Sequence, residues 1–216
     1  MTTAYEKAQL AGQNAVRTAI LDAAIRLLAD EGPAALTVRR ISGDVGCSTK
    51  VIYTMFGGKD GLVEALWREG FARFGRALAA APRGDDPVKH LAALGRAYRA
   101  YALAEPNYYR IMFEAAVPGF RPGPEAYAES RETLAILVGV VEECVKAGVF
   151  TEGEPAAIAD TFWMAAHGAV SLELAGIFGP EEGERRFHML TTALVRAYGT
   201  QSRPGPAEPD QERNRQ

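Results

Sequence analysis

A short segment near residue 50 brings together side chains that can hydrogen-bond to a nucleic acid. Thr49, Lys50, Tyr53 and Thr54 supply two hydroxyls, one ammonium group and one phenol. Such groups bind base edges and phosphate oxygens, and they suit a solvent-facing surface better than an apolar core. This pattern predicts a helix that reads the major groove of DNA.

A recognition helix needs a partner helix to hold it, and the preceding residues supply one. Thr37 is a good N-cap for a first helix, and Ser48 can cap the second, which runs to about Met55. Gly46 stands where the chain must leave the first helix, since glycine adopts left-handed backbone angles without steric cost. Two short helices around a tight turn form a helix-turn-helix. The inward positions are apolar at helical spacing: Val38, Ile41, Val45, Val51, Ile52 and Phe56.

Residues 16–66 resemble the DNA-binding region of the tetracycline-repressor (TetR) family of bacterial regulators. The matching features are the leading helix over 15–31, the TVRRI sequence, the Gly46-Cys47-Ser48 turn, the Tyr53-Thr54-Met55-Phe56 end of the recognition helix, and Lys59 with Leu62 in the next helix. Met55 stands where the family often has histidine, and Gly58 replaces the more common Ser or Asn cap.

The resemblance implies DNA contacts for seven residues. They are Thr37, Arg39, Ser48, Thr49, Lys50, Tyr53 and Lys59. By analogy with the family, the residues at the front of the recognition helix read bases, and Thr37, Tyr53 and Lys59 contact the phosphate backbone. Lys59 also opens a helix, where free N–H groups and the helix dipole favour a phosphate. The alternative is that the basic residues among them simply solvate a surface.

The charge balance bounds the strength of DNA binding. The 216-residue chain has a formal net charge of −3, and residues 1–60 hold seven Lys/Arg and six Asp/Glu. A basic surface must therefore come from arrangement, with Arg39, Arg40, Lys50 and Lys59 on one side. This predicts moderate non-specific affinity and a modest salt dependence.

The whole chain reads as all-α. We predict a flexible arm over 1–14, a helix-turn-helix DNA-binding domain of three helices over 15–60, a helical ligand-binding and dimerisation domain over 61–199, and a disordered tail over 200–216. The helices expected after the recognition helix span residues 59–80, 87–105, 107–113, 125–149, 155–178 and 180–198.

Aromatic residues concentrate in the C-terminal domain. Rings, a few polar groups and adaptable thioethers are typical of a pocket for an apolar ligand, although the same rings could simply form the core. The candidate ligand-binding residues are Tyr101, Tyr109, Met112, Phe113, Phe162, Trp163 and His167. A pocket is the favoured interpretation, because nothing else in the chain could sense a signal.

The last two long helices are rich in small and apolar residues, which predicts a four-helix bundle between two copies of the chain. The resemblance implies the same, since family members are typically dimers through these helices. Residues 106–178 further resemble a TetR subgroup marked by a tryptophan and a His-Gly pair, here Trp163, His167 and Gly168, with Pro106–Phe113 upstream.

Other kinds of site find little support. Cys47 and Cys144 suggest small buried hydrophobes rather than a disulfide, and His90, His167 and His188 lack metal-ligand spacing, so neither a metal nor a cofactor is expected. No secretory signal or bilayer-spanning run is seen, which favours a cytoplasmic protein without membrane contact.

The sequence therefore predicts a ligand-responsive transcriptional regulator that is not an enzyme. It is expected to repress by binding a palindromic double-stranded operator as a homodimer, and to be released by a small apolar or aromatic molecule. Two alternatives stay open. One is a helical enzyme in the C-terminal pocket, where His167 and Ser171 are four residues apart but Glu173 points away; the other is a protein-interaction module.

Overall fold

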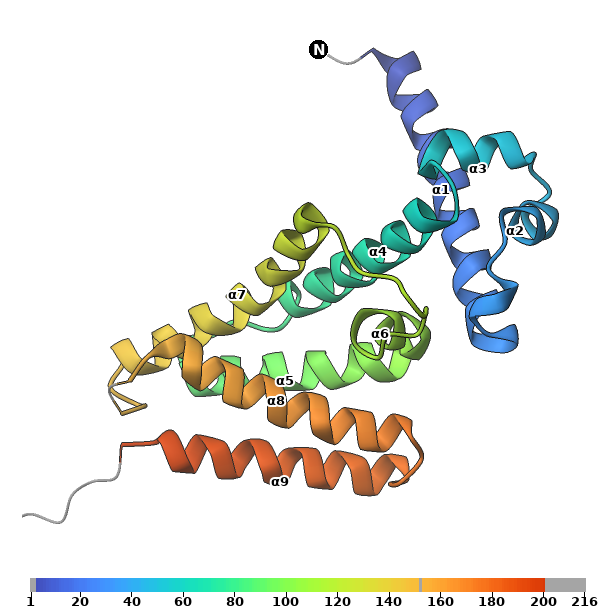
Figure 1. Cartoon of the computed structure of the whole chain (residues 1–216). Helices are drawn as coiled ribbons and strands as arrows, with labels where there is room; N and C mark the ends of the chain where they lie inside the picture. The colour runs from blue at the N-terminus through green and yellow to red at the C-terminus, as the bar shows by residue number, and fades with distance from the viewer. Residues whose placement is uncertain (1–2, 152, 201–216) are drawn as a thin grey trace, which may run out of the picture.

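The computed structural model describes residues 3–151 and 153–200, and helices make up most of this part of the chain (Figure 1). The helices are α1 (Ala4–Glu31), the short 3-10 helix η1 (Pro33–Ala35), α2 (Val38–Val45), α3 (Thr49–Phe56), α4 (Lys59–Ala79), α5 (Pro87–Ala104), α6 (Pro106–Phe113), α7 (Pro124–Lys146), α8 (Pro155–Leu174) and α9 (Pro180–Tyr198). Within the described residues, β structure is limited to one isolated bridge between Phe150 and Gly199. The predicted all-α class is confirmed: a small head (α1–α3) is joined by α4 to a larger helical body (α4–α9).

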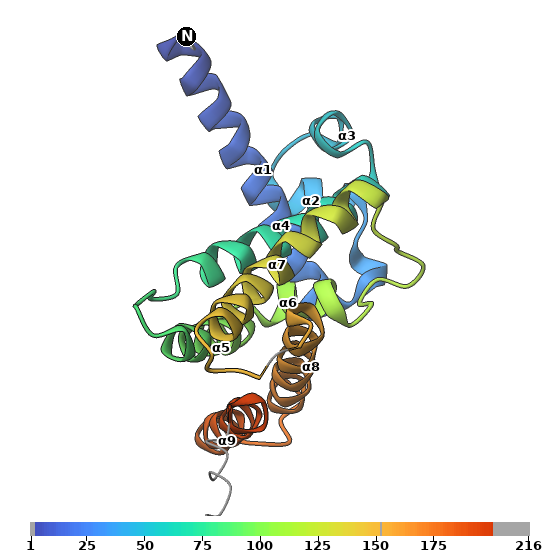
Figure 2. The same cartoon turned by 90° about the vertical axis from the view of Figure 1, so that its left-hand side faces the viewer.

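Helix α1 starts well before its predicted first residue. The Thr3 hydroxyl accepts a hydrogen bond from the Glu6 N–H (3.2 Å), and the Glu6 carboxylate accepts one from the Thr3 N–H (2.7 Å). This reciprocal capping box satisfies two free N–H groups and starts the helix at Ala4. The prediction of a loose arm over 1–14 is therefore wrong for residues 4–14, which form helix. Their turns project beyond the rest of the head in both views (Figures 1 and 2).

The head has its own apolar core. Residues from α1, α2, α3 and the first half of α4 meet there, and the most deeply buried are Ile20, Leu21, Ala24, Ile41, Ile52, Leu62 and Leu66. Because the first turns of α4 belong to this core, the predicted boundary at residue 60 falls inside a continuous helix.

The body arranges its helices in layers around a second core. Helix α4 packs against α5 and α7, α8 packs against α5 and α7, and α9 covers α8 and part of α5 (Figures 1 and 2). The core is unusually aromatic, with Phe74, Tyr98, Tyr101, Tyr109, Phe150, Phe162 and Phe187 buried. Helices α8 and α9 lie on the side of the body away from the head (Figure 1).

Two helices end earlier than predicted. Helix α7 stops at Lys146 because Gly148 turns the chain with φ 68°, and α8 stops at Leu174 because Gly176 does so with φ 75°. After each turn a backbone N–H bonds back to the helix, from Val149 to Cys144 (3.0 Å) and from Ile177 to Leu172 (3.1 Å). Of the predicted disordered tail, residues 201–216 lie outside the described residues.

Helix α6 belongs to both cores at once. Tyr108 and Ile111 are buried in the head core, whereas Tyr109 and Met112 are buried in the body core. One short helix therefore separates the two halves of the molecule and contacts each of them. None of the helices in the described part of the chain is both long and apolar enough to cross a membrane.

Candidate nucleic-acid interface and ligand cavity

The head presents the predicted helix-turn-helix. Helices α2 and α3 are joined by a turn in which Gly46 has φ 74°, and Ile52 anchors α3 with no exposed surface. All seven predicted DNA-binding residues are exposed. They lie at the start of α2 (Thr37, Arg39), just before α3 (Ser48), on α3 (Thr49, Lys50, Tyr53) and at the first residue of α4 (Lys59).

The N-terminal caps of the two helices differ. The Thr37 hydroxyl accepts a hydrogen bond from the Arg40 N–H at 3.2 Å and so caps α2. Ser48 has the extended backbone of an N-cap, but its hydroxyl does not bond to the first turn of α3. The prediction that Ser48 caps α3 is right for the backbone position and wrong for the side chain, whose hydroxyl is left for another partner.

The cations of this surface are not equally available. Arg40 forms ion pairs with Glu31 (2.9 Å) and Asp44 (3.6 Å). Arg39, Lys50 and Lys59 have no carboxylate within 4.0 Å in the part of the chain that the structure describes. The free positive charge of the head surface is therefore smaller than the sequence suggested, because Arg40 is already neutralised.

A close backbone contact fixes α3 relative to α4. A Cβ atom at Gly61 would stand 1.9 Å from the carbonyl oxygen of Phe56, so only glycine permits this approach. Beside this contact, Tyr53 leaves 56% of its surface exposed. The recognition helix is thereby attached rigidly to the helix that enters the body.

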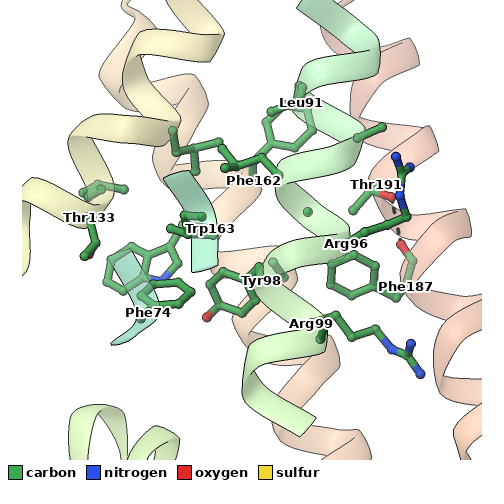
Figure 3. A pocket seen from close by; sticks show the side chains of 18 of the residues that line it. Phe74, Leu91, Arg96, Tyr98, Arg99, Thr133, Phe162, Trp163, Phe187 and Thr191 are labelled. Atoms are coloured by element: carbon green, nitrogen blue, oxygen red, sulfur yellow. Dashed lines mark hydrogen bonds between the residues drawn. The ribbon is translucent and has the colours of Figure 1, made fainter. Parts of the chain in front are cut away.

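The body contains a cavity of about 940 Å³ among α4–α9 (Figure 3). This volume is within the range of small-molecule sites. Four of the predicted ligand-binding residues line it: Met112, Phe113, Phe162 and Trp163.

The other three predicted ligand-binding residues lie behind the cavity wall. Tyr101 donates its hydroxyl hydrogen to the Gly70 carbonyl at 2.8 Å. The Tyr109 hydroxyl is 2.6 Å from Nδ1 of His167 and 2.8 Å from the hydroxyl of Tyr98, which does line the cavity. A buried hydrogen-bond chain thus supports the wall.

Burial sets the protonation states of Tyr98, Tyr109 and His167, the three side chains linked by these hydrogen bonds. It lowers the pKa of His167 and raises the pKa of Tyr109, and it raises the pKa of Tyr98 to about 12. At pH 7 all three groups are therefore neutral, as an apolar surrounding requires.

Comparison with known families decides the identity of this architecture. Residues 20–66 match the family described as "Bacterial regulatory proteins, tetR family", and residues 91–208, more than half of the chain, match "Tetracyclin repressor-like, C-terminal domain". The chain belongs to the TetR family. That family is one of bacterial regulatory proteins.

Individual relatives agree with this assignment. The TetR-family chain is 24% identical over 141 residues to the HTH-type transcriptional regulator Rv1816 of Mycobacterium tuberculosis, covering 63% of this chain and 58% of that protein. It is 35% identical over 79 residues to the regulator BetI of Brucella canis, covering 36% of this chain and 40% of BetI. The matches thus span less than two thirds of these relatives.

Solved structures show the same fold. The regulatory protein SCO4313 superposes with a TM-score of 0.71 at 29% identity, over 85% of this chain and 97% of the other. The TetR-family regulator PfmR of Thermus thermophilus gives a TM-score of 0.65 at 19% identity, over 84% and 98% of the two chains.

The geometry around His167 does not assemble a nucleophilic relay in this TetR-family chain. His167 Nδ1 is engaged by Tyr109, and both oxygens of Glu173 are held by Arg99. The hydroxyl of Ser171 is buried without a hydrogen-bond partner among the described residues. A nucleophile, a base and an orienting acid in mutual contact are what such catalysis needs.

Several cavity residues escaped the sequence reasoning. Trp67, Phe71 and Phe74 on α4 line the cavity, although their spacing reads equally as ordinary core. Arg96, Arg99 and Arg131 also line it, and each reads in sequence as part of a solvated helix face. Only the packing of α4, α7 and α9 around α5 brings these residues to one space.

Proposed function

We propose that this TetR-family regulator is a repressor that binds a palindromic operator as a homodimer and is released by a small molecule bound in the body. The observation that carries the proposal is the double role of α6, which contacts both the cavity and the head core. The proposal has three parts, namely the DNA surface, the dimer and the coupling between cavity and head.

The DNA surface is supported by exposure and chemistry. Lys50 and Tyr53 are exposed on α3, and the Ser48 hydroxyl makes no hydrogen bond to the first turn of that helix. Short hydroxyls and a lysine at the front of a recognition helix can read base edges, while Tyr53 and Lys59 can hold phosphates. Family membership adds that such a helix acts on duplex DNA.

The dimer is supported by unpartnered apolar faces on the outermost helices. Met164 and Leu172 on α8 are 62% and 47% exposed, and Met189 on α9 is 61% exposed. A second copy packed on these faces would bury them and place two recognition helices on one side of a duplex. Replacing Leu172 by Glu should then give a monomer in sedimentation experiments, and it should weaken operator binding because half of the contacts are lost.

The coupling runs through α4 and α6. A ligand in the cavity touches Met112 and Phe113 of α6, while Tyr108, one helical turn before Met112, packs in the head core. On α4, Arg73 bonds to Asp22 of α1 (3.0 Å) and its guanidinium lies 4.4 Å from the centre of the Tyr108 ring. Displacing either helix therefore changes how the head is held.

The energy required is modest. A ligand shifts the balance between DNA-competent and DNA-incompetent states only by its differential affinity for them. A tenfold loss of operator affinity requires a coupling free energy of about 1.4 kcal/mol.

The test begins with the operator. Purified full-length protein selects duplexes from a random pool, and we expect two inverted half-sites whose centres are about 10 base pairs apart or a multiple of that. Lys50→Ala and Tyr53→Ala should each weaken binding to the selected duplex by about tenfold, since one good contact contributes roughly 1–3 kcal/mol.

One substitution in the body serves as a matched control. Lys89→Ala removes an exposed lysine on α5 that does not line the cavity. It should bind the duplex like wild type. Equal binding by all three variants would contradict the assigned surface, and the absence of any enriched duplex would favour a protein-interaction module.

A further inference from the structure

The cavity has two chemically different ends. Figure 3 shows the rings of Phe74, Tyr98 and Trp163 together at one end, and Arg96 and Arg99 at the other end beside α9. A ligand that fills this space would contact the aromatic rings at one end and the guanidinium groups at the other.

Arg99 is already committed within the protein. It donates to both oxygens of Glu173 at 2.9 and 2.7 Å and to the carbonyl of Pro180 at 3.0 Å, and its Nη1 is 3.8 Å from Glu184. Its charge is therefore balanced before any ligand arrives. Arg99 serves as a fixed wall of the cavity rather than as a free binding group.

Arg96 differs from Arg99 in having no such partner. No carboxylate lies within 4.0 Å of it in residues 3–151 and 153–200. Figure 3 places its guanidinium beside Thr191, in the space between α5 and α9. At Gly95, the residue before Arg96, the Phe187 ring of α9 packs on α5: a Cβ atom there would lie 3.6 Å from the ring. Arg96 is exposed and thus lies at the lip of the apolar cavity, where its guanidinium is accessible to the polar group of a ligand.

The residues that line the cavity carry more positive than negative charge. Its described lining residues include three arginines and one carboxylate, Glu184; Arg99 is paired with Glu173 and Glu184, so the charges without a carboxylate partner are those of Arg96 and Arg131. Arg131, the third arginine, is exposed on α7 and also lacks a carboxylate partner in the described chain. A cationic ligand would be repelled by this lining. A wholly apolar ligand would make no use of the end of the cavity where Arg96 lies.

We propose that the effector is an amphipathic anion, with an apolar, ring-containing body among the aromatic side chains and an acidic group bound by Arg96. This inference rests on the proposed function, since it names the chemical class of the molecule that releases the DNA. A carboxylate, sulfonate or phosphate would each satisfy it, because the guanidinium fork binds all three through paired N–H groups.

Two probes that differ only in their acidic group test the proposal. Anilinonaphthalene sulfonate is an aromatic anion, and phenylnaphthylamine is its uncharged parent; both become fluorescent in apolar surroundings. Both tryptophans of the chain, Trp67 and Trp163, line the cavity, so energy transfer from tryptophan to probe reports binding there. The probes are titrated into the full-length protein and into two variants.

Arg96→Gln is the test variant and Arg121→Gln is the control. Arg121 is exposed in the loop before α7 and does not line the cavity, so both changes remove one positive charge from the body. We expect Arg96→Gln to weaken binding of the sulfonate about tenfold and to leave the parent unchanged, whereas Arg121→Gln should change neither. In the wild-type protein, added salt should weaken binding of the sulfonate more than binding of the uncharged parent. This difference should be smaller in Arg96→Gln.

The outcomes separate this inference from the proposed function. If Arg96→Gln leaves the ratio of the two affinities at its wild-type value, or if Arg131→Gln changes it instead, the anion site at Arg96 is refuted. If the uncharged parent releases the selected duplex as well as the sulfonate does, the proposed function stands and the inference fails. If neither probe shows energy transfer, the cavity is not a ligand site and the effector part of the proposed function fails as well.

Discussion

Replacing Gly183 by alanine should destabilise the protein, although the same change stabilises most helices. Gly183 lies near the start of α9, and a methyl group there would stand 2.4 Å from Cδ of Glu173 and 2.7 Å from each carboxylate oxygen. That carboxylate is bound by Arg99 through two hydrogen bonds, and only 5% of the Glu173 side chain is exposed. The methyl group therefore cannot be accommodated without displacing a buried ion pair.

The size of the effect follows from two opposing contributions. Alanine in place of a helical glycine normally gains about 0.5–1 kcal/mol. Separating a buried ion pair by removing one partner costs about 3–5 kcal/mol, and displacing it without removal should cost part of that. We therefore expect Gly183→Ala to lower the free energy of unfolding by about 1–3 kcal/mol.

Urea unfolding followed by far-ultraviolet circular dichroism measures the change, at one protein concentration because a dimer would make the midpoint concentration-dependent. Gly139→Ala in α7 is the matched control, since no atom lies within 4 Å of its new Cβ, and it should be neutral or stabilising. In a Glu173→Ala background, Gly183→Ala should no longer destabilise. The reasoning is refuted if Gly183→Ala is at least as stable as wild type.

Three further predictions concern the Thr37 cap, the half-buried His167 and the arginine between head and body. Thr37→Ala removes the hydroxyl that accepts the Arg40 N–H, and it should lower the free energy of unfolding by about 1 kcal/mol in urea titrations. Because burial lowers the pKa of His167, the unfolded chain binds more protons at mildly acidic pH; the stability from this group is present above the unfolded pKa and is lost as pH falls below about 6.5. His167→Gln should remove that part of the pH dependence of unfolding. Arg73→Met removes the bond to Asp22, and it should reduce the release of operator by a bound ligand several-fold in anisotropy titrations.

Each of these has an outcome that contradicts it. An unchanged urea midpoint for Thr37→Ala would mean that the cap contributes nothing. For the histidine, the control is His188→Gln, which alters an exposed histidine; equal flattening of the pH profile by both variants would contradict the assignment to His167. For Arg73→Met, full ligand-induced release would show that coupling does not pass through this contact.

The head could be read from sequence because its signals are local. Thr37, Gly46 and the apolar spacing of α2 and α3 act within a few residues of each other, and each has one strong physical interpretation. The missed start of α1 also had a local signal, since Thr3 and Glu6 stand at capping-box spacing. Residues 1–14 are polar but also rich in alanine, which favours helix more than any other residue.

The cavity could not be read in the same way because it depends on contacts between distant segments. Phe74 and Trp163 are far apart in sequence and meet only when α4 and α8 close around α5 and α6. Arg96 is ambiguous for the same reason, since the sequence does not reveal that α9 covers one side of α5. A helical period identifies a face of a helix, but it does not identify what the face contacts.

Helix α6 shows why the coupling also lies beyond sequence reasoning. The sequence predicts pocket roles for Tyr109, Met112 and Phe113 but gives no sign that neighbouring residues pack in different cores, Tyr108 in that of the head and Tyr109 in that of the body. A helix of this length cannot move one face without the other, because its backbone hydrogen bonds make it a rigid unit. A ligand that displaces Met112 from within the cavity must therefore also disturb the packing of the Tyr108 ring against Arg73. Communication between the two halves then needs no long chain of residues, only one helix with two occupied faces.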